Sequence, residues 1–419
     1  MGNSPNHQAI FLSNKADKQF FIHQLLNKKA VGSFADFNQL NGVLFSSIAI
    51  NQMIAEEDRH GNLAAITKGV TPIRLLSGGE QKKMLLNYLL HQQPGFIIAD
   101  NPFDNLDTAT QAELLLLLQE VALCTPIIQL INRTRDLLPF IKKGVTIARD
   151  NTLLPLIDIT AYLLQHQKIA VPVYINPLPV GNHEYAEEQN PLVAFKNVTV
   201  QYNDRVIVTN INWQINKGEC WQLIGSNGSG KSTLLSLITG DNPKAFGQNI
   251  VLFGKRKGSG ESVWSIKEKI GYFTASMMDL FGRYSTVEQM VVSGFFDSIG
   301  LYTKPSPRQQ KLADEWLKLV GMQAQKNTPF FKLSLGQQRL MMIVRAMVKH
   351  PPLLILDEPT VGLDDENVAI VIALVNKILA ETNTAIIFVA HQIEAALSPK
   401  FIYALSSGQF GSTGSQLEH

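Results

Sequence analysis

The chain of 419 residues contains two stretches that repeat each other over 32 positions without a gap. Residues 76–107 read LSGGEQKKMLLNYLLHQQPGFIIADNPFDNLD, and residues 333–364 read LSLGQQRLMMIVRAMVKHPPLLILDEPTVGLD. The offset is constant at 257 residues, so that Asp100 corresponds to Asp357. Because a repeat of this length and regularity is not expected by chance, the sequence predicts two copies of one structural unit.

A proline-rich segment separates the two copies. Residues 166–191 contain four prolines and several acidic side chains, a composition that opposes both helix and sheet. We interpret this segment as a linker between a first domain, residues 1–165, and a second domain, residues 192–416. Residues 417–419 are interpreted as the remnant of a purification tag.

Each copy alternates short apolar runs with longer patterned segments. Residues 353–356 and 386–389 are rich in Val, Ile and Leu, whereas residues 110–123 carry the apolar spacing of a helix. This alternation is typical of βαβ units around a parallel sheet. The predicted fold class is therefore α/β, with a mainly parallel sheet flanked by helices in each half.

Composition excludes several classes of protein. Lys and Arg number 37 against 35 Asp and Glu, a near-neutral balance that disfavours nucleic acid as the main ligand. No run approaches the roughly 18 apolar residues of a membrane helix. The chain has only two cysteines, Cys124 and Cys220, and it opens without a secretory leader. We therefore expect a cytoplasmic protein.

A glycine-rich motif marks the second half. Residues 225–232 read GSNGSGKS and fit the pattern G-x-x-x-x-G-K-[ST], with a strand candidate at 221–224 and a helix candidate at 233–238. Glycines let successive backbone N–H groups surround phosphate oxygens, Lys231 would reach the β- and γ-phosphates, and Ser232 would bind Mg²⁺. A plain glycine-rich turn is the alternative.

Polar residues follow two apolar strands of the same half. Residues 353–356 lead into Asp357 and Glu358, at the carboxyl edge where parallel sheets place their ligands. Asp357 would hold Mg²⁺ and Glu358 would polarise the attacking water, whereas an acidic helix cap is the alternative. His391 ends the run IIFVAH and is a candidate γ-phosphate sensor or a structural histidine.

Together these motifs resemble those of the ATP-binding cassette (ABC) ATPases, which are P-loop NTPases. LSGGE at 76–80 matches the family's signature, and residues 362–364 match the loop after its catalytic carboxylate. The resemblance extends to the ModF-type molybdenum-transport ATP-binding proteins, through stretches such as STLLSLITGDNP (232–243) and QQRLMMIVRAMVKHPPLLILDEP (337–359). It implies two tandem cassettes, each with a helical signature subdomain, that pair head to tail within the chain.

The resemblance also implies which residues bind ATP and Mg²⁺. Contacts with the nucleotide are expected from Tyr202, Gly225, Ser226, Asn227, Gly228, Ser229, Gly230, Lys231, Ser232 and Thr233. The signature of the first half would close over the same ATP through Ser77, Gly78, Gly79 and Glu80. Tyr202, 29 residues before Lys231, would stack on the adenine. The expected catalytic residues are Glu358 and His391, and the expected metal ligands are Ser232 and Asp357.

The phosphate loop of the first half is degenerate. Aligning residues 10–21 with residues 223–234 pairs Lys18 with Lys231, but Leu12, Lys15 and Asp17 replace the three glycines and Gln19 replaces the metal-binding serine. The charge of Asp17 would repel an anion. This half also begins too close to its loop to contain a counterpart of Tyr202. We therefore predict a degenerate, truncated first cassette.

The defects gather in one of the two composite sites that head-to-tail pairing would form. Asn101 stands at the position of Glu358, Asn132 stands at the position of His391, and the signature at 333–337 reads LSLGQ. The motifs of the other site are intact. We interpret this sorting as one active site per chain, with a decaying duplicate as the alternative.

The implied function is an ATP-binding and ATP-hydrolysing subunit related to transport of molybdate or another oxyanion. Its partner would be a separate membrane permease, which would bring the protein to the inner face of the membrane. Ala275 stands where the family has a Gln that links the metal site to such a partner, which disfavours ordinary coupling. The alternatives are a non-transport ABC ATPase acting on ribosomes or nucleic acid, and a regulatory ATP switch with little turnover.

Overall fold

The structure is a computed structural model that forms two compact units. Met1–Ile169 and Gly362–Glu366 make up the first unit, and Ala170–Val361 and Asn367–His419 make up the second. The residues that it describes are 5–13, 16–60, 72–147, 152–166, 174–181, 189–282, 284–397 and 399–417.

The first unit is built on a six-stranded sheet covered by helices. Its strands, in spatial order, are β2 (Gly42–Phe45), β3 (Phe96–Asp100), β4 (Ile127–Ile131), β1 (Gln8–Phe11), β5 (Lys143–Ile147) and β6 (Leu153–Pro155). All neighbours are parallel except β5 and β6. The helices are α1 (Lys18–Leu26), α2 (Ser47–His60), α4 (Gly78–His91), α5 (Thr108–Ala122) and α6 (Ile159–His166). The central strands are buried, as their continuous apolar runs predict.

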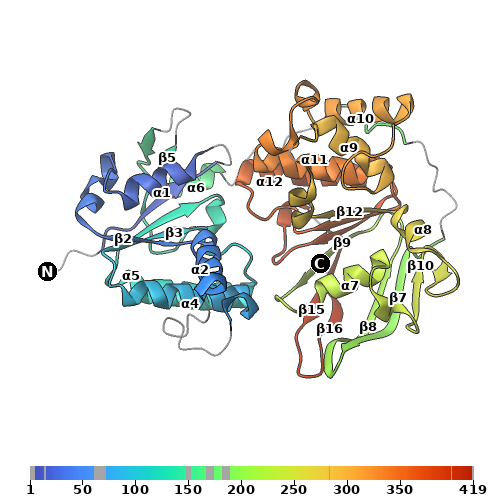
Figure 1. Ribbon diagram of the computed structural model, residues 1–419, viewed down its shortest axis with the longest axis horizontal. Helices are drawn as coiled ribbons and strands as arrows, with labels where there is room; N and C mark the ends of the chain where they lie inside the picture. The colour runs from blue at the N-terminus through green and yellow to red at the C-terminus, as the bar shows by residue number, and fades with distance from the viewer. Residues whose placement is uncertain are drawn as a thin grey trace. The chain divides into compact units, whose positions relative to one another are not determined.

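The second unit repeats this sheet. Its strands, in spatial order, are β12 (Ile270–Thr274), β13 (Leu353–Asp357), β14 (Ala385–Val389), β9 (Cys220–Gly225), β15 (Phe401–Ser406) and β16 (Thr413–Leu417). Again only the last pair is antiparallel. The helices are α7 (Lys231–Thr239), α8 (Val263–Lys267), α9 (Val287–Val292), α10 (Pro307–Leu319), α11 (Leu335–Met347) and α12 (Asp365–Glu381) (Figure 1). The two sheets share one strand order, so the predicted α/β fold of two similar units is confirmed.

A second sheet belongs to the second unit alone among the described residues. Its antiparallel strands, in spatial order, are β11 (Lys255–Arg256), β10 (Ile250–Leu252), β7 (Val193–Tyr202) and β8 (Arg205–Ile215). Alternate side chains of β7 and β8 enter a core shared with the main sheet. Trp213 of β8 stacks on Tyr403 of β15, with ring centroids 4.6 Å apart. The part of the first unit that is described contains no counterpart of this sheet.

A helical part of the second unit precedes and includes α11. Helix α9 packs against both α10 and α11, and Trp316 of α10 is fully buried. The buried guanidinium of Arg345 donates to Ser293 Oγ at 3.1 Å and to the Ser298 carbonyl at 2.8 Å, which fixes α11 against the preceding segment. Since α11 begins one residue after Ser334, this packing positions the second signature. Strand β16 extends through Leu417, one residue beyond the expected end of the second domain.

Candidate functional site

The glycine-rich loop lies between β9 and α7, as its flanking apolar runs predicted. Gly228 and Gly230 have φ angles of +75° and +96°, in the left-handed region that favours glycine. A Cβ on Gly230 would also come within 2.5 Å of the Val208 side chain. These conformations turn the loop toward the first turn of α7, where unpaired backbone N–H groups favour an anion.

Lys231 occupies the inside of this loop. Its ammonium donates to the carbonyl oxygens of Gly225 at 2.7 Å and Ser226 at 3.1 Å, and only 8% of the residue is exposed. Ser229 Oγ is buried without a hydrogen-bond partner among the described residues. Ser232 lies exposed in the first turn of α7. A cation and an unsatisfied hydroxyl gathered in a glycine-rich loop are suited to bind phosphate.

Asp357 ends β13, and Glu358 follows it with a φ of +55°. This angle is unusual for a residue with a long side chain, and such strain is common at functional sites. The next helix, α12, begins only at Asp365, so the alternative that the Asp-Glu pair caps a helix is wrong. Glu358 Oε1 lies 2.9 Å from His391 Nε2, which brings together two residues from neighbouring strand ends.

The pKa values of the two carboxylates of this site are shifted in opposite directions. The hydrogen bond from His391 lowers the pKa of Glu358. Burial, together with the negative charge of Glu358, raises the pKa of Asp357 to about 6. The positive charge of Lys231 favours the ionised form of both. Glu358 is therefore suited to accept a hydrogen bond from water, and a cation beside Asp357 would offset the cost of its ionisation.

The donor set fits a magnesium ion that binds together with phosphates. Among the described residues, no group of three or more His, Cys, Asp or Glu side chains forms a self-sufficient metal site. Mg²⁺ commonly takes one or two protein oxygens and completes its shell with phosphate and water. Asp357 and Ser232 are oxygen donors of this kind, and they would hold the ion that neutralises charge on the phosphates.

Tyr202 lies at the end of β7 and is 40% exposed. Its hydroxyl accepts a hydrogen bond from Asn242 Nδ2 at 2.8 Å, and the ammonium of Lys244 lies 5.8 Å from the ring centroid. Both partners follow the C-terminal end of α7, whereas the loop lies at its N-terminal end. Stacking of this ring on adenine stays a prediction.

The first signature begins α4. Ser77 caps this helix, its Oγ donates to Glu80 Oε2 at 2.6 Å, and the Glu80 N–H returns a bond to Ser77 Oγ. The Glu80 carboxylate accepts from the Ser77 hydroxyl and from the Ser77 N–H, and these two bonds lower its pKa. A Cβ on Gly78 would find its nearest neighbour at 4.0 Å, whereas a Cβ on Gly79 would lie 2.3 Å from Thr110. Gly79 is therefore needed for packing, and Gly78 leaves open space.

Two charged side chains at the degenerate loop of the first unit are engaged in contacts within that unit. Lys18 Nζ pairs with Asp100 at 2.9 Å, and Asp100 is buried at the end of β3. The Asp17 carboxylate accepts a bond from the Phe20 N–H and thus occupies the helix N-terminus that an anion would need. Lys15, one of the expected glycine replacements, lies outside the described residues.

Two arginines near these sites carry no motif and were missed by sequence reasoning. Arg339 of α11 is buried, its Nε and Nη1 have no hydrogen-bond partner among the described residues, and its guanidinium lies 5.5 Å from the Phe273 ring centroid. Its charge contributes to the low pKa of Glu358. Arg133 donates from Nε to the Leu363 carbonyl at 3.2 Å. The only sequence signal for Arg133 is that it follows Asn132.

Comparisons with known proteins agree with this geometry. The family model described as ABC transporter matches residues 208–361. ModF of Escherichia coli, an ABC transporter ATP-binding protein, is 40% identical over 337 residues, which cover 77% of this chain and 68% of ModF. An ABC transporter ATP-binding protein of Schizosaccharomyces pombe is 30% identical over 75% of this chain and 65% of its own length. The chain thus spans about two thirds of the length of these relatives.

Solved structures extend the likeness in fold to both halves. A model of ribosome-bound archaeal Pelota and ABCE1 aligns with 98% of this chain and 74% of its own, at a TM-score of 0.65 and 14% identity. No helix in the described part of the chain is long and apolar enough to cross a membrane. With its two similar units, its phosphate loop and its likeness to ModF, the chain belongs to the family of ABC transporter ATP-binding proteins.

Proposed function

We propose that the second unit binds Mg-ATP and hydrolyses it. The observation that carries the proposal is the Glu358–His391 pair at 2.9 Å, one residue beyond Asp357 and within the electrostatic influence of Lys231. Lys231 and the loop backbone would hold the phosphates, and Ser232 and Asp357 would hold the magnesium ion. Mg²⁺ would supply charge neutralisation on the transferred phosphoryl group.

Glu358 and His391 would orient the attacking water. An ionised Glu358 accepts a hydrogen bond from the water and orients it toward the γ-phosphorus. His391, already hydrogen-bonded to that carboxylate, would keep its direction fixed and donate toward the phosphate when the pair separates. As the family resemblance implies, Ser77, Gly78, Gly79 and Glu80 of the first signature would complete this site, whereas the degenerate first loop would take no part in it.

The biological role that we propose is transport-related, with molybdate or another oxyanion as the cargo. The support is the similarity to ModF, whose name places it among transporter ATP-binding proteins. A separate permease would then recognise the cargo, and the protein would work in the cytoplasm at the inner face of the membrane. The likeness to ribosome-bound ABCE1 concerns the fold alone, and the net charge of +2 does not favour a nucleic-acid partner.

The proposal is tested by comparing ATP hydrolysis in the wild type and in Glu358→Gln. This variant keeps the shape of the side chain and one acceptor oxygen, but it removes the charge and turns the second acceptor into a donor. We expect kcat to fall about 100-fold or more while Mg-ATP binding is retained. Glu315→Gln, on the solvent-facing side of α10 with its side chain 44% exposed, is the matched control and should leave kcat unchanged.

Equal hydrolysis in the Glu358→Gln variant and the wild type would exclude Glu358 as the catalytic carboxylate. A wild type that binds Mg-ATP without hydrolysing it would instead favour the regulatory switch. Stimulation of ATP turnover by RNA, but not by vesicles that contain a permease, would contradict the transport role and favour nucleic-acid remodelling.

A further inference from the structure

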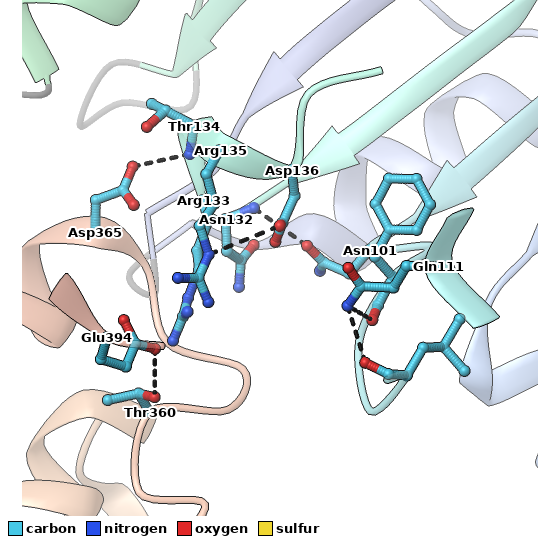
Figure 2. Close-up of polar contacts among 12 residues, drawn as sticks. Asn101, Gln111, Asn132, Arg133, Thr134, Arg135, Asp136, Thr360, Asp365 and Glu394 are labelled. Carbon is cyan, nitrogen blue, oxygen red and sulfur yellow. Dashed lines mark hydrogen bonds and ion pairs between the residues drawn. The ribbon is translucent and has the colours of Figure 1, made fainter. Parts of the chain in front are cut away.

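The segment Gly362–Glu366, which comprises the loop before α12 and the first two residues of that helix, belongs to the first unit. Three consecutive residues after β4 donate hydrogen bonds to it. Asn132 Nδ2 donates to the Gly362 carbonyl at 3.3 Å, Arg133 Nε donates to the Leu363 carbonyl at 3.2 Å, and the Thr134 N–H donates to Asp365 Oδ2 at 2.9 Å. Figure 2 shows the Thr134–Asp365 bond beside the extended Arg133 side chain.

These contacts lie in a buried environment. Arg133 is 8% exposed, although its side chain carries a permanent charge, and Leu363 is fully buried. Removing the donor to a buried carbonyl destabilises the folded state by about 1 kcal/mol or more, because the carbonyl is left without a hydrogen bond. Because the three donors are adjacent in sequence and reach two loop carbonyls and the first residue of α12, they restrict the loop up to the start of the helix.

The same donors continue into the degenerate site. Asn101 Oδ1 accepts from the Asn132 N–H at 3.1 Å, and Asn101 Nδ2 donates to Asp100 at 3.1 Å. Asp100 is the partner of Lys18. A continuous set of polar contacts therefore runs from Lys18 to Gly362. Asn101 and Asn132, which stand at the positions of Glu358 and His391, are parts of it, and both use amide groups that can donate and accept.

The loop is also tied closely to Glu358. The Val361 N–H donates to the Glu358 carbonyl at 3.4 Å, which closes a turn just before Gly362. Thr360 Oγ1 donates to Glu394 Oε1 at 3.2 Å, and both residues are buried (Figure 2). Since only three residues separate Glu358 from Gly362, a shift of the loop would change the direction of the Glu358 side chain.

We propose that Asn132 and Arg133 are positioning residues for ATP hydrolysis, acting through the segment Gly362–Glu366 on Glu358. The degenerate site of the first unit then has a task of its own, which is to hold the loop that sets the catalytic carboxylate. The inference rests on the proposed hydrolysis at Glu358. It makes the first unit necessary for turnover by a route separate from its signature.

The test combines kinetics with hydrogen exchange on the full chain. The Asn132→Ala/Arg133→Ala double variant removes two donors, and Arg133→Lys keeps the charge but moves the donor. For the double variant we expect kcat to fall about tenfold, KM and the Kd of a fluorescent ATP analogue to stay within about twofold, and amide exchange over residues 359–366 to accelerate about tenfold. Arg133→Lys should lose less than about threefold in kcat.

Arg74→Ala is the control, because Arg74 is an exposed arginine of the same unit that pairs with Asp58 on the surface. The inference is overturned if the double variant matches this control in kcat and in exchange. It is also overturned if exchange accelerates evenly across the first unit in both test variants, which would indicate general stability. Should the wild type hydrolyse no ATP, the proposed function fails, and exchange over residues 359–366 alone decides whether these side chains hold the loop.

Discussion

The two units give equivalent lysines different hydrogen-bond and ion-pair partners. Lys18 of the first unit forms an ion pair with Asp100, whereas Lys231 of the second unit donates to carbonyls of its own loop. The first arrangement neutralises both charges and needs no ligand. In the second, Asp357 has no ion-pair partner among the described residues, and burial raises its pKa. We therefore expect phosphate and Mg²⁺ to bind at the second loop rather than at the first, where Lys18 is held by its ion pair with Asp100.

The two units also share backbone conformations at positions where their side chains differ. Asn101 and Glu358 both have left-handed backbones, with φ angles of +42° and +55°, at positions 257 residues apart. Gln93 and His350, also 257 residues apart, have φ angles of +48° and +51°. The repeat therefore preserves strained turns that shape the sheet edge, although the side chains that they carry have changed.

The largest contrast is expected between the two lysines. Lys231→Ala should lower the affinity for Mg-ATP by roughly 100-fold or more, because it removes a charge that faces the phosphates. Lys18→Ala should leave that affinity within about twofold and instead lower the free energy of unfolding by about 1–2 kcal/mol, because buried Asp100 loses its ion pair. Titration with a fluorescent ATP analogue and urea unfolding measure the two effects.

A comparable loss of ATP affinity in Lys231→Ala and Lys18→Ala would contradict this contrast between the two loops, because the first loop would then bind nucleotide as well. The conservative pair Lys231→Arg and Lys18→Arg serves as a control, since only Lys18→Arg should be tolerated.

The two signatures differ at equivalent positions, Gly78 and Leu335, whose residues can be exchanged by single substitutions. Gly78→Leu gives the first signature the residue that Leu335 places in the second, and Leu335→Gly is the reverse change. We expect Gly78→Leu to lower kcat about tenfold or more, because a side chain would block close approach of the helix N-terminus to phosphate. Leu335→Gly should leave kcat within about twofold.

Gly78 is the better test position because its Cβ would meet open space, whereas a side chain on Gly79 would clash with Thr110 and disturb the fold. Thermal unfolding of the Gly78→Leu variant should therefore match that of the wild type. Undiminished ATP turnover in this variant would show that the first signature takes no part in the site.

The smallest effect concerns a buried carboxylate that the second unit lacks. Asp104 corresponds to the apolar Val361, and burial raises its pKa to about 6. The folded protein then holds a proton that the unfolded chain releases near pH 4, so this contribution to stability is lost as the pH rises through 6. Asp104→Asn should raise the free energy of unfolding by about 1 kcal/mol at pH 7.5 and leave it unchanged at pH 4. Equal stabilisation at both pH values would refute this account.

Sequence patterns predicted the parts of the molecule that local rules determine. The repeat led to two sheets of one strand order, and the flanking runs located the loop between β9 and α7. The negative charge of Asp17 was foreseen as an obstacle to phosphate, but its use as the cap of α1 depends on backbone geometry at the helix start. A capping residue and a repelling charge look alike in sequence.

The contacts of Arg133 and the pairing of Lys18 with Asp100 could not be predicted. Each joins residues far apart in the chain, and nothing in the local sequence of either partner signals the other. The same holds for Gly362–Glu366, which the repeat assigns to the second domain although the segment belongs to the first compact unit. Periodicity and motifs describe elements, whereas these features arise from how elements meet.

The left-handed turn shared by Asn101 and Glu358 has a consequence for backbone strain. Asparagine tolerates this conformation better than glutamate, by about 1 kcal/mol, so the first unit holds the turn at a lower cost than the second. An Asn101→Glu substitution would introduce that strain into the first unit, and it would also remove the amide that contacts Asp100. The turn at Glu358 is thus a place where the second unit gives up stability to hold a carboxylate beside His391.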